Sequence, residues 1–280
     1  MKISLITACY NSAATIRTCI DSVLSQQGVD VEYIVVDGGS TDDTVEILKG
    51  YEKRLLNLST VQPFNFRWLS EKDRGMYDAI NKGIKMATGD VVGILNADDV
   101  LATDDTLAHI AELFSHKEQK GQESGEEICG HVDCVYADIR FVREGGTVEA
   151  LRGAPTVRYC SAKRWRPWMF RFAAMVPHPS FYVRRECFER LGGYSLDYRI
   201  CSDFELELRY LYLAKLKAAY LPECVVVMRM GGASTAGWRS NVEINLEDLR
   251  ALRAHGIWSC LPLIYLKYLF KIWGFVFKRK

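Results

Sequence analysis

Short apolar runs alternate with helical periodicity along the first hundred residues. The runs cover residues 3–9, 33–36, 66–69 and 91–95. Their length and their polar or glycine-rich flanks are typical of buried strands. Between them, Ile16, Ile20 and Val23 recur at helical spacing, and residues 76–87 repeat the pattern. Alternating strands and helices predict an α/β fold, with a mostly parallel central sheet and helices on both faces.

The second half of the chain has a less regular pattern. We expect strands at residues 132–142, 180–183 and within 218–230, helices at 202–212 and 241–255, and a polar surface loop at 119–127. Residues 1–237 are predicted to form one domain, in which residues 1–100 bind a nucleotide and residues 101–237 form the catalytic half. Residues 238–280 are predicted to form a C-terminal helical extension.

The segment at residues 257–277 is the most hydrophobic part of the chain. On a helical wheel its polar side contains Lys267, Lys271, Gly274 and Lys278, and apolar and aromatic residues cover the rest. This pattern predicts an amphipathic helix in a membrane interface, with residues 278–280 favouring anionic lipid. The alternatives are a helix that packs in the core or in a dimer, and a membrane-spanning helix, which the lysines disfavour.

Composition and charge narrow the classes of function. The 280 residues are 49% hydrophobic and 25% charged, as in a folded globular protein, and the net charge of +1 gives no indication of nucleic-acid binding. The nine cysteines contain no CxxC pair, which favours free thiols in a reducing compartment over disulfides or a metal site. The short N-terminal apolar run does not fit a signal peptide. We therefore predict a cytoplasmic protein, peripheral on the inner face of the cell membrane.

Acidic residues follow the strand predicted at residues 91–95. The segment Asn96-Ala97-Asp98-Asp99 places two carboxylates side by side, and a hard divalent cation such as magnesium or manganese would offset their repulsion. The alternative is a loop whose acids cap the next helix.

Residues 37–44 form a second candidate ligand loop. Gly38 and Gly39 allow the backbone to approach a flat or phosphorylated ligand, and Asp37 can accept hydrogen bonds from a base or ribose. The alternative is a tight turn that caps the following helix. Ligands of parallel sheets bind at the carboxyl ends of the strands, so residues 7–11, 37–43 and 96–99 are expected at one edge.

Four ordered segments resemble glycosyltransferase family 2, the inverting nucleotide-sugar transferases of the GT-A fold. They are TACYN from residue 7, VVDGGSTDDT from residue 35, SEKDRGMYDAINKGIKMATGD from residue 70 and ILNADD from residue 94. The resemblance covers the first hundred residues closely and extends more loosely to about residue 235.

The resemblance implies transfer of a sugar from a nucleotide-sugar donor, UDP-linked in our reading, to an acceptor hydroxyl. It assigns the donor site to Thr7, Ala8, Tyr10, Asn11, Asp37, Gly38, Asp73, Arg74, Asn96 and Asp98. It also implies a magnesium or manganese ion bound by Asp98 and Asp99. Asn96 stands where many family members have Asp, so the direct ligand of the two acids stays open.

Single displacement requires a carboxylate base near the acceptor hydroxyl. Asp203, in the sequence CSDFEL, resembles the second acidic motif of the family, and Glu205 is the alternative base. Ser202 and Glu205 also fit a helix capping box, which would leave Asp203 as a first-turn acid.

The acceptor side is predicted from weaker signals. His178 and Trp168 are candidate acceptor contacts, and the basic, aromatic residues 163–172 suit a membrane-side acceptor, single-stranded nucleic acid or a packed linker. Residues 231–235 resemble the flexible loop of the family, and Arg229 is a candidate phosphate contact. We favour a glycan or lipid-linked acceptor in surface polysaccharide synthesis.

Two other classes of function stay open. One is a non-catalytic nucleotide-binding membrane adaptor, which Asn96 and the lack of a His near residue 229 leave room for. The other is a dinucleotide-dependent oxidoreductase, which is disfavoured because no GxGxxG follows the first strand.

Overall fold

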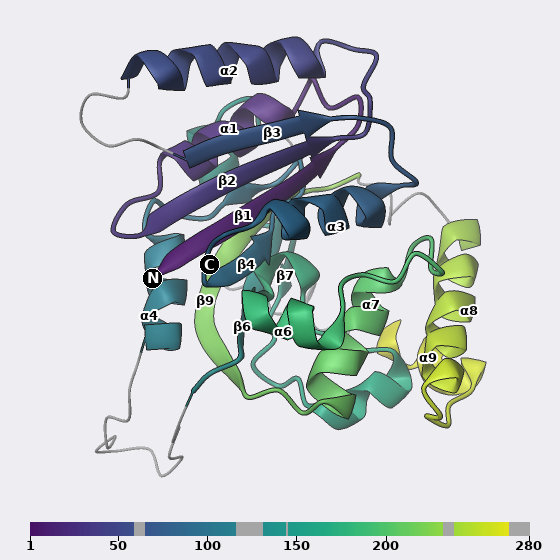
Figure 1. The fold of residues 1–280 in the computed structure, drawn as a ribbon. Coiled ribbons are helices and arrows are strands. Elements are labelled where there is room, and N and C mark those ends of the chain that lie inside the picture. Colours follow the sequence, from purple (N-terminus) through teal and green to yellow (C-terminus); the bar gives the residue numbers. More distant parts are fainter. Residues whose placement is uncertain (59–64, 116–130, 144, 232–237, 269–280) are drawn as a thin grey trace.

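The computed structural model describes residues 1–58, 65–115, 131–143, 145–231 and 238–268 (Figure 1). Within these residues, nine strands form one sheet in the order β3-β2-β1-β4-β8-β6-β9-β5, and β7 pairs with β6. The strands are β1 (Lys2–Cys9), β2 (Asp30–Asp37), β3 (Asn65–Ser70), β4 (Val91–Ile94), β5 (Val100–Leu101), β6 (Cys134–Val142), β7 (Arg158–Cys160), β8 (Tyr182–Arg184) and β9 (Ala218–Arg229).

Helices connect and cover these strands. They are α1 (Ile16–Leu24), α2 (Thr44–Leu58), α3 (Met76–Met86), α4 (Thr106–Ser115), α5 (Val148–Gly153), α6 (Arg185–Leu191), α7 (Ser202–Glu207), α8 (Trp238–Ala254) and α9 (Leu261–Tyr265). Shorter turns are the 3-10 helices η1 (Pro167–Phe172) and η2 (His178–Ser180) and the π-helix η3 (Leu208–Leu213). The helix predicted at residues 202–212 is therefore α-helical only as far as Glu207.

Strand direction places the ligand loops at one edge. β3, β2, β1 and β4 pair in parallel, as do β6 and β9, and these registers are longer than the antiparallel ones. β8 pairs antiparallel with both β4 and β6, so it joins the two halves of the sheet. The mostly parallel sheet predicted from the sequence is confirmed. The carboxyl ends of β1, β2, β3 and β4 point to the same edge.

The alternation of side chains along the strands produces a core on each face of the sheet. Ile6 and Val36 pack with Ile80 of α3, whereas Leu5 and Val35 pack with residues of α1 and α2. Figure 1 shows α3 on one side of the strands and α1 and α2 on the other. Burial of each such side chain contributes about 1.5–3 kcal/mol, so the parallel half has strong support on both faces.

Helices α8 and α9 of the C-terminal extension pack against elements of the second half of the chain. α8 lies beside α7, and α9 lies near η1 (Figure 1). Lys267 is buried and its Nζ lies 2.6 Å from Asp248 Oδ2 of α8. Its predicted position on an exposed polar stripe is therefore wrong, because a buried carboxylate on α8 holds its charge inside the protein. The predicted stripe residues Lys271, Gly274 and Lys278 lie outside the described residues.

Two further expectations can be compared with the structure. None of the helices in the described ranges is both long enough and apolar enough to cross a membrane. The eight cysteines among the described residues are all free, as the sequence predicts, and five of them are buried. The polar stretch at residues 119–127 lies outside the described residues.

Candidate active site

The loops after β1 and β2 are bound to each other at the carboxyl edge of the sheet. Asn11 adopts a left-handed backbone conformation with φ 49°, which a short polar side chain tolerates. Its Oδ1 accepts a hydrogen bond of 2.8 Å from the Thr41 amide. Asp42 Oδ2 accepts another, of 3.0 Å, from the Ala13 amide. Two loops about 30 residues apart in the sequence therefore form one surface.

Asp37 and Thr7 support this surface from behind. The Asp37 carboxylate is fully buried and accepts hydrogen bonds from the Ser40 hydroxyl, from Ser70 Oγ at 2.7 Å and from the Gly39 amide at 3.1 Å. Thr7 is also fully buried, and its Oγ1 accepts from Tyr33 at 3.1 Å. Both side chains are therefore buried and bonded within the protein, behind the loop surface.

Other predicted donor residues lie on the open side of the loops. Tyr10 is 61% exposed, and Asn11 and Arg74 are also exposed, whereas Ala8 is half-buried. The exposed Arg74 guanidinium lies 3.6 Å from the largely buried carboxylate of Asp78.

Gly38 brings the loop after β2 against Asp73. A Cβ at Gly38 would collide with Asp73 Oδ2, so any other residue here would force the Asp73 carboxylate to move. Asp73 Oδ1 accepts a hydrogen bond of 2.8 Å from the Gly75 amide, just before α3. The donor-side loops therefore continue directly into the start of α3.

The two acids after β4 have different environments. Asp99 is fully buried, and its Oδ2 accepts a hydrogen bond of 2.8 Å from the Asn96 amide group. Its Oδ1 has no hydrogen-bond partner in the part of the chain that the structure describes. Burial, and then the charge of Asp98, hold the pKa of Asp99 well above its usual range. Asp98 is half-buried, so it is the more accessible carboxylate.

Arg229, at the end of β9, holds the acidic loop of residues 96–99 by hydrogen bonds. Its guanidinium donates hydrogen bonds to the Asp98 carbonyl oxygen, to Thr18 Oγ1 at 2.8 Å and to the Gly145 carbonyl oxygen at 3.2 Å. These contacts differ from the direct phosphate contact that we predicted. Most of the glycine loop that follows, residues 232–235, lies outside the described residues. No group of three or more His, Cys, Asp and Glu residues suited to a metal occurs in the described ranges.

Asp203 lies in the first turn of α7 and is half-buried. Its Oδ1 accepts hydrogen bonds from the Tyr77 hydroxyl at 3.1 Å and from the Phe204 amide at 2.8 Å. The predicted capping box does not form, because the N-cap is Cys201 and Ser202 Oγ donates to the Ser195 carbonyl oxygen at 2.7 Å. A residue of α3, 126 positions away, therefore orients the predicted base.

Glu205, the alternative base, is already engaged by protein groups. It is buried, it accepts hydrogen bonds of 2.8 and 2.9 Å from the Arg209 guanidinium, and its Oε1 lies 2.9 Å from His255 Nε2. An acceptor hydroxyl would have to displace one of these charged partners. The geometry therefore favours Asp203 over Glu205.

The two remaining acceptor-side candidates differ in exposure. His178 is buried, its Nε2 lies 2.7 Å from the Tyr194 hydroxyl, and burial lowers its pKa, which favours a neutral ring. Trp168 of η1 is 55% exposed, with its ring against Phe172. The structure places Trp168 on the surface and His178 behind Tyr194.

Sequence reasoning assigned no role to Tyr77 and Asn81, which join the two halves of the site. Asn81 exchanges two hydrogen bonds with the backbone of Tyr194, of 2.8 and 2.9 Å, and the rings of Tyr77 and Tyr194 stack with centroids 5.5 Å apart. Both residues lie in the family-like segment of α3, four positions apart on one helical face. Their spacing was the only feature of the sequence that could have indicated that Tyr77 and Asn81 act on the same neighbouring segment.

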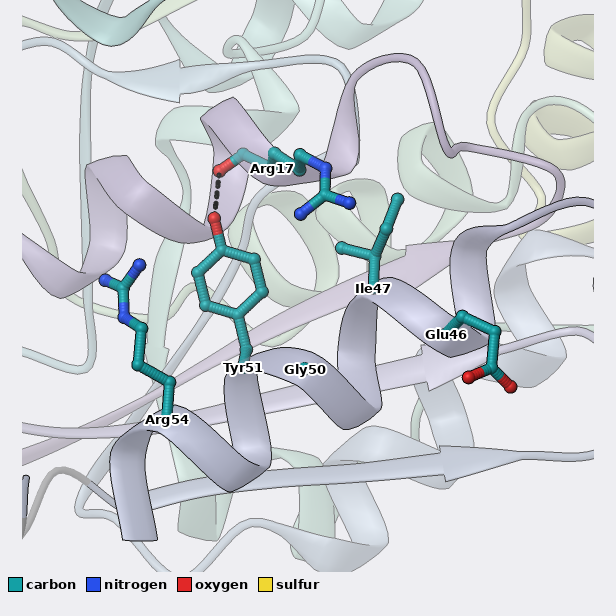
Figure 2. Close-up of a pocket in the computed structure, with 6 residues that line it drawn as sticks. All are labelled: Arg17, Glu46, Ile47, Gly50, Tyr51 and Arg54. Carbon is teal, nitrogen blue, oxygen red and sulfur yellow. Dashed lines mark hydrogen bonds between the residues drawn. The ribbon is translucent and has the colours of Figure 1, made fainter. Parts of the chain in front are cut away.

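A separate hollow lies between α1 and α2 (Figure 2). It is lined by Arg17, Glu46, Ile47, Gly50, Tyr51 and Arg54. The Tyr51 hydroxyl donates to the Arg17 carbonyl oxygen at 3.4 Å, and the Arg54 guanidinium lies 5.1 Å from the centre of the Tyr51 ring. None of the predicted site residues lines this hollow.

Comparison with known proteins identifies the family. The family model described as Glycosyl transferase family 2 matches residues 4–121. A PGL/p-HBAD biosynthesis glycosyltransferase of Mycobacterium bovis is 28% identical over 253 residues, covering 89% of this chain and 83% of that protein. An uncharacterized glycosyltransferase of Mycobacterium tuberculosis is 30% identical over 211 residues, covering 74% of this chain and 68% of that protein.

Solved structures agree on the fold. S. aureus TarS 1-349 in complex with UDP-GlcNAc has a TM-score of 0.63 at 18% identity, and the match covers 90% of this chain and 66% of that one. The mannosyltransferase PcManGT from Pyrobaculum calidifontis, in complex with GDP-Man and Mn²⁺, has a TM-score of 0.61 at 21% identity, covering 98% and 72%. These likenesses leave no support for the oxidoreductase alternative. The chain therefore belongs to glycosyltransferase family 2, has the GT-A fold and is a glycosyltransferase.

Proposed function

We propose that the protein moves a sugar from a UDP-linked donor to an acceptor hydroxyl by inversion, with Asp203 as general base. The observation that carries this proposal is the placement of Asp203, half-buried in the first turn of α7 with Oδ1 fixed by Tyr77 at 3.1 Å. A base for single displacement must be a carboxylate within reach of the acceptor hydroxyl. Both contacts of Asp203 engage Oδ1, so we assign Oδ2 to accept the hydroxyl proton.

For the donor we propose the surface formed by the loops after β1, β2 and β4 and the start of α3. We assign it to Ala8, Tyr10, Asn11, Gly38, Asp73, Arg74, Asn96 and Asp98. The exposed Tyr10 ring suits stacking on a base, and Gly38 allows close approach of the backbone. Thr7 and Asp37 would support this surface from behind. The UDP-GlcNAc complex of TarS supports a UDP-linked donor.

A divalent cation, magnesium or manganese, fits the acidic loop. Asp98 is the accessible carboxylate, and Asp99 keeps an unpartnered buried oxygen beside it within the described structure. Burial and the charge of Asp98 raise the pKa of Asp99, and a cation bound beside the two acids would instead favour its ionised form. We propose Asp98 as the direct ligand. When bound, the ion would stabilise charge on the leaving diphosphate. The PcManGT complex contains Mn²⁺.

Nucleotide release tests the proposed chemistry. The protein is incubated with UDP-GlcNAc, UDP-glucose or GDP-mannose, with Mn²⁺ or Mg²⁺, and free nucleoside diphosphate is measured. Asp203→Asn is expected to lower turnover by about 10³-fold, while UDP binding, measured by calorimetry, stays unchanged. The matched control is Asp197→Asn, an exposed acid on the same loop.

Two outcomes would contradict the proposal. Near-normal turnover of Asp203→Asn would exclude Asp203 as the base. Tight donor binding by the wild-type protein, without transfer to any acceptor, would favour the non-catalytic adaptor.

We also propose that the acceptor is lipid-linked and that the protein contacts an anionic membrane from the inner face. Trp168 and Trp258 are 55% and 72% exposed, and Lys163, Arg164 and Arg171 near Trp168 are exposed as well. The two tryptophan segments lie together, since Ser259 Oγ donates to the Arg171 carbonyl oxygen at 2.7 Å. Exposed tryptophans beside basic side chains suit an anionic lipid surface.

Vesicle sedimentation tests this membrane contact. Binding is expected to vesicles that contain phosphatidylglycerol and to be much weaker with phosphatidylcholine alone. The double variant Trp168→Ala/Trp258→Ala should lose most of the binding. Leu56→Ala, which removes a 70% exposed apolar residue on α2, serves as control. Equal binding by the double variant and the control would exclude this surface.

A further inference from the structure

Helix α8 holds the loop that leads to Asp203. The Glu247 carboxylate accepts hydrogen bonds from three successive backbone amides of this loop. Oε1 accepts from Arg199 at 3.1 Å, and Oε2 accepts from Ile200 at 2.9 Å and from Cys201 at 3.0 Å. Figure 1 shows α8 and α7 side by side at this point. Bonds from amides to an ionised carboxylate are stronger than neutral ones, so this contact fixes the loop backbone.

Further contacts from α8 support the same loop. Cys201 Sγ donates to the Ile244 carbonyl oxygen at 3.5 Å. The Arg250 guanidinium donates to the Asp197 carbonyl oxygen at 3.3 Å and lies 5.2 Å from the centre of the Tyr198 ring. Together with Glu247, these residues of α8 contact the loop along residues 197–201.

Ile200 connects the contacts made by α8 to the proposed base. Its amide is held by Glu247, and its carbonyl oxygen accepts a hydrogen bond from the Tyr77 hydroxyl. Asp203 Oδ1 lies 3.1 Å from the same hydroxyl, so the Ile200 carbonyl oxygen and the Asp203 carboxylate share its single proton. A shift of Ile200 would therefore move the partner of the Asp203 carboxylate as well as the start of α7.

We propose that Glu247 is a positioning residue for sugar transfer: it fixes residues 199–201 so that Asp203 and Tyr77 keep the geometry in which the acceptor proton is accepted. This inference rests on the proposed role of Asp203. It makes the C-terminal extension part of the catalytic apparatus. Glu247 acts through residues 199–201 and Tyr77, and none of these is among the residues assigned to the donor, so donor binding is predicted not to depend on it.

Two substitutions of Glu247 and one matched control test the proposal. Glu247→Gln keeps the size of the side chain but removes the charge, and Glu247→Ala removes all three hydrogen bonds. Both should lower kcat, by about tenfold and about a hundredfold respectively, because small displacements of a reacting group have effects of this size. The donor KM and the Kd for UDP should stay within about twofold of wild type. Glu243→Gln removes the same charge from an exposed site on the same helix. Among the described residues, Glu243 pairs only with the 82% exposed Arg199 side chain, at 3.7 Å, and the structure gives it no bond to the amides of residues 199–201, so this variant should leave all constants unchanged.

Hydrogen exchange gives a readout that does not depend on transfer. Amides of residues 199–201 should exchange faster in Glu247→Gln than in wild type or Glu243→Gln, at an unchanged melting temperature. If Glu247→Ala fails to fold, the exchange rates and kcat of Glu247→Gln alone test the inference. Faster exchange with unchanged kcat, or unchanged exchange in both variants, would overturn the inference.

The outcome for Asp203 separates the two proposals. If Asp203→Asn is inactive while Glu247→Gln and Glu247→Ala are fully active, only the positioning role fails. If Asp203→Asn retains turnover, the proposed base itself is wrong and the role of Glu247 fails with it.

Discussion

The proposed donor edge and the proposed catalytic side of this molecule are built in different ways. At the donor edge, each candidate residue lies within a few positions of the end of its own strand, as Tyr10 follows β1 and Asp98 follows β4. On the catalytic side, Tyr77, Asp203 and Glu247 come from three helices that are far apart in the sequence. The sheet positions the first group, and side-chain hydrogen bonds position the second.

This difference has a consequence for function. A loop fixed by a parallel strand keeps its position when one side chain changes, because the ladder of backbone hydrogen bonds stays intact. A helix fixed by a few side-chain contacts moves when one of them is removed. Substitutions on the catalytic side should therefore change turnover with little effect on donor binding, and substitutions at the donor edge should change both.

The largest effect is expected where the C-terminal extension joins the catalytic half. Lys267→Met leaves the Asp248 carboxylate buried without its partner, in a pair whose side chains are only 6% and 4% exposed. Loss of one partner of a buried ion pair costs about 3–5 kcal/mol. Urea unfolding should show this loss, and the double variant Lys267→Met/Asp248→Asn should recover at least half. A cost below about 1 kcal/mol would mean that the extension is not integral to the fold.

The acidic loop allows a comparison within the donor edge. Asp98→Asn should lower kcat/KM by about a hundredfold and weaken the dependence on Mn²⁺, because the accessible carboxylate is proposed to hold the ion. Asp99→Asn is the matched control, since an amide can still accept the hydrogen bond from Asn96, and it should cost less than about tenfold. Activity measured across a Mn²⁺ titration distinguishes the two. A larger loss in Asp99→Asn would reverse the assignment of the direct ligand.

Glu207 makes the stability of the catalytic side depend on pH. Burial, and then the charge of Asp203, raise the pKa of Glu207 well above its usual range. The native state therefore retains a proton that the unfolded state releases above about pH 4.5, so native stability falls as pH rises from there. The slope that this group can contribute is at most about 1.4 kcal/mol per pH unit.

The substitution Glu207→Gln tests that slope. Gln can still accept the hydrogen bond that the Val176 amide donates at 3.1 Å, and it does not ionise. Relative to wild type, the variant should become more stable as the pH rises above about 5, by at most about 1.4 kcal/mol per pH unit, measured by urea unfolding at each pH. Glu243→Gln should show no such difference, because its carboxylate is half exposed. Parallel curves for wild type and Glu207→Gln would show that Glu207 is ionised in the native state.

The same contrast explains what the sequence could predict. Apolar strands such as residues 91–95 and the acids after them could be recognised because local pattern determines both. The position of Asp203 at the start of a helix was also predictable. The contact between Tyr77 and Asp203 was not, because it joins residues 126 positions apart through a single hydroxyl. Glu247 had no signal of its own in a helix of mixed charge.

Lys267 shows a different limit. A helical wheel groups residues by side, and it gave Lys267 a polar side together with Lys271 and Lys278. It does not tell whether that side faces solvent or a buried acid on another helix. In the structure that side faces the buried carboxylate of Asp248, 19 positions earlier. Only tertiary packing brings Lys267 and Asp248 together.

The smallest effect that we predict is also the sharpest test of how the two sides are joined. Tyr77→Phe keeps the ring that stacks on Tyr194 but removes the hydroxyl that donates to Asp203 and Ile200. A hydrogen bond to a charged group is worth about 1.5–3 kcal/mol, and Asp203 keeps its bond from the Phe204 amide, so kcat should fall only about tenfold. Tyr194→Phe removes the hydroxyl that contacts His178 instead and should change kcat less than about twofold. Steady-state kinetics with the donor measures both variants. An unchanged kcat in Tyr77→Phe would mean that the packing of the two rings, and not the bond to Asp203, transmits the position of α3 to the base.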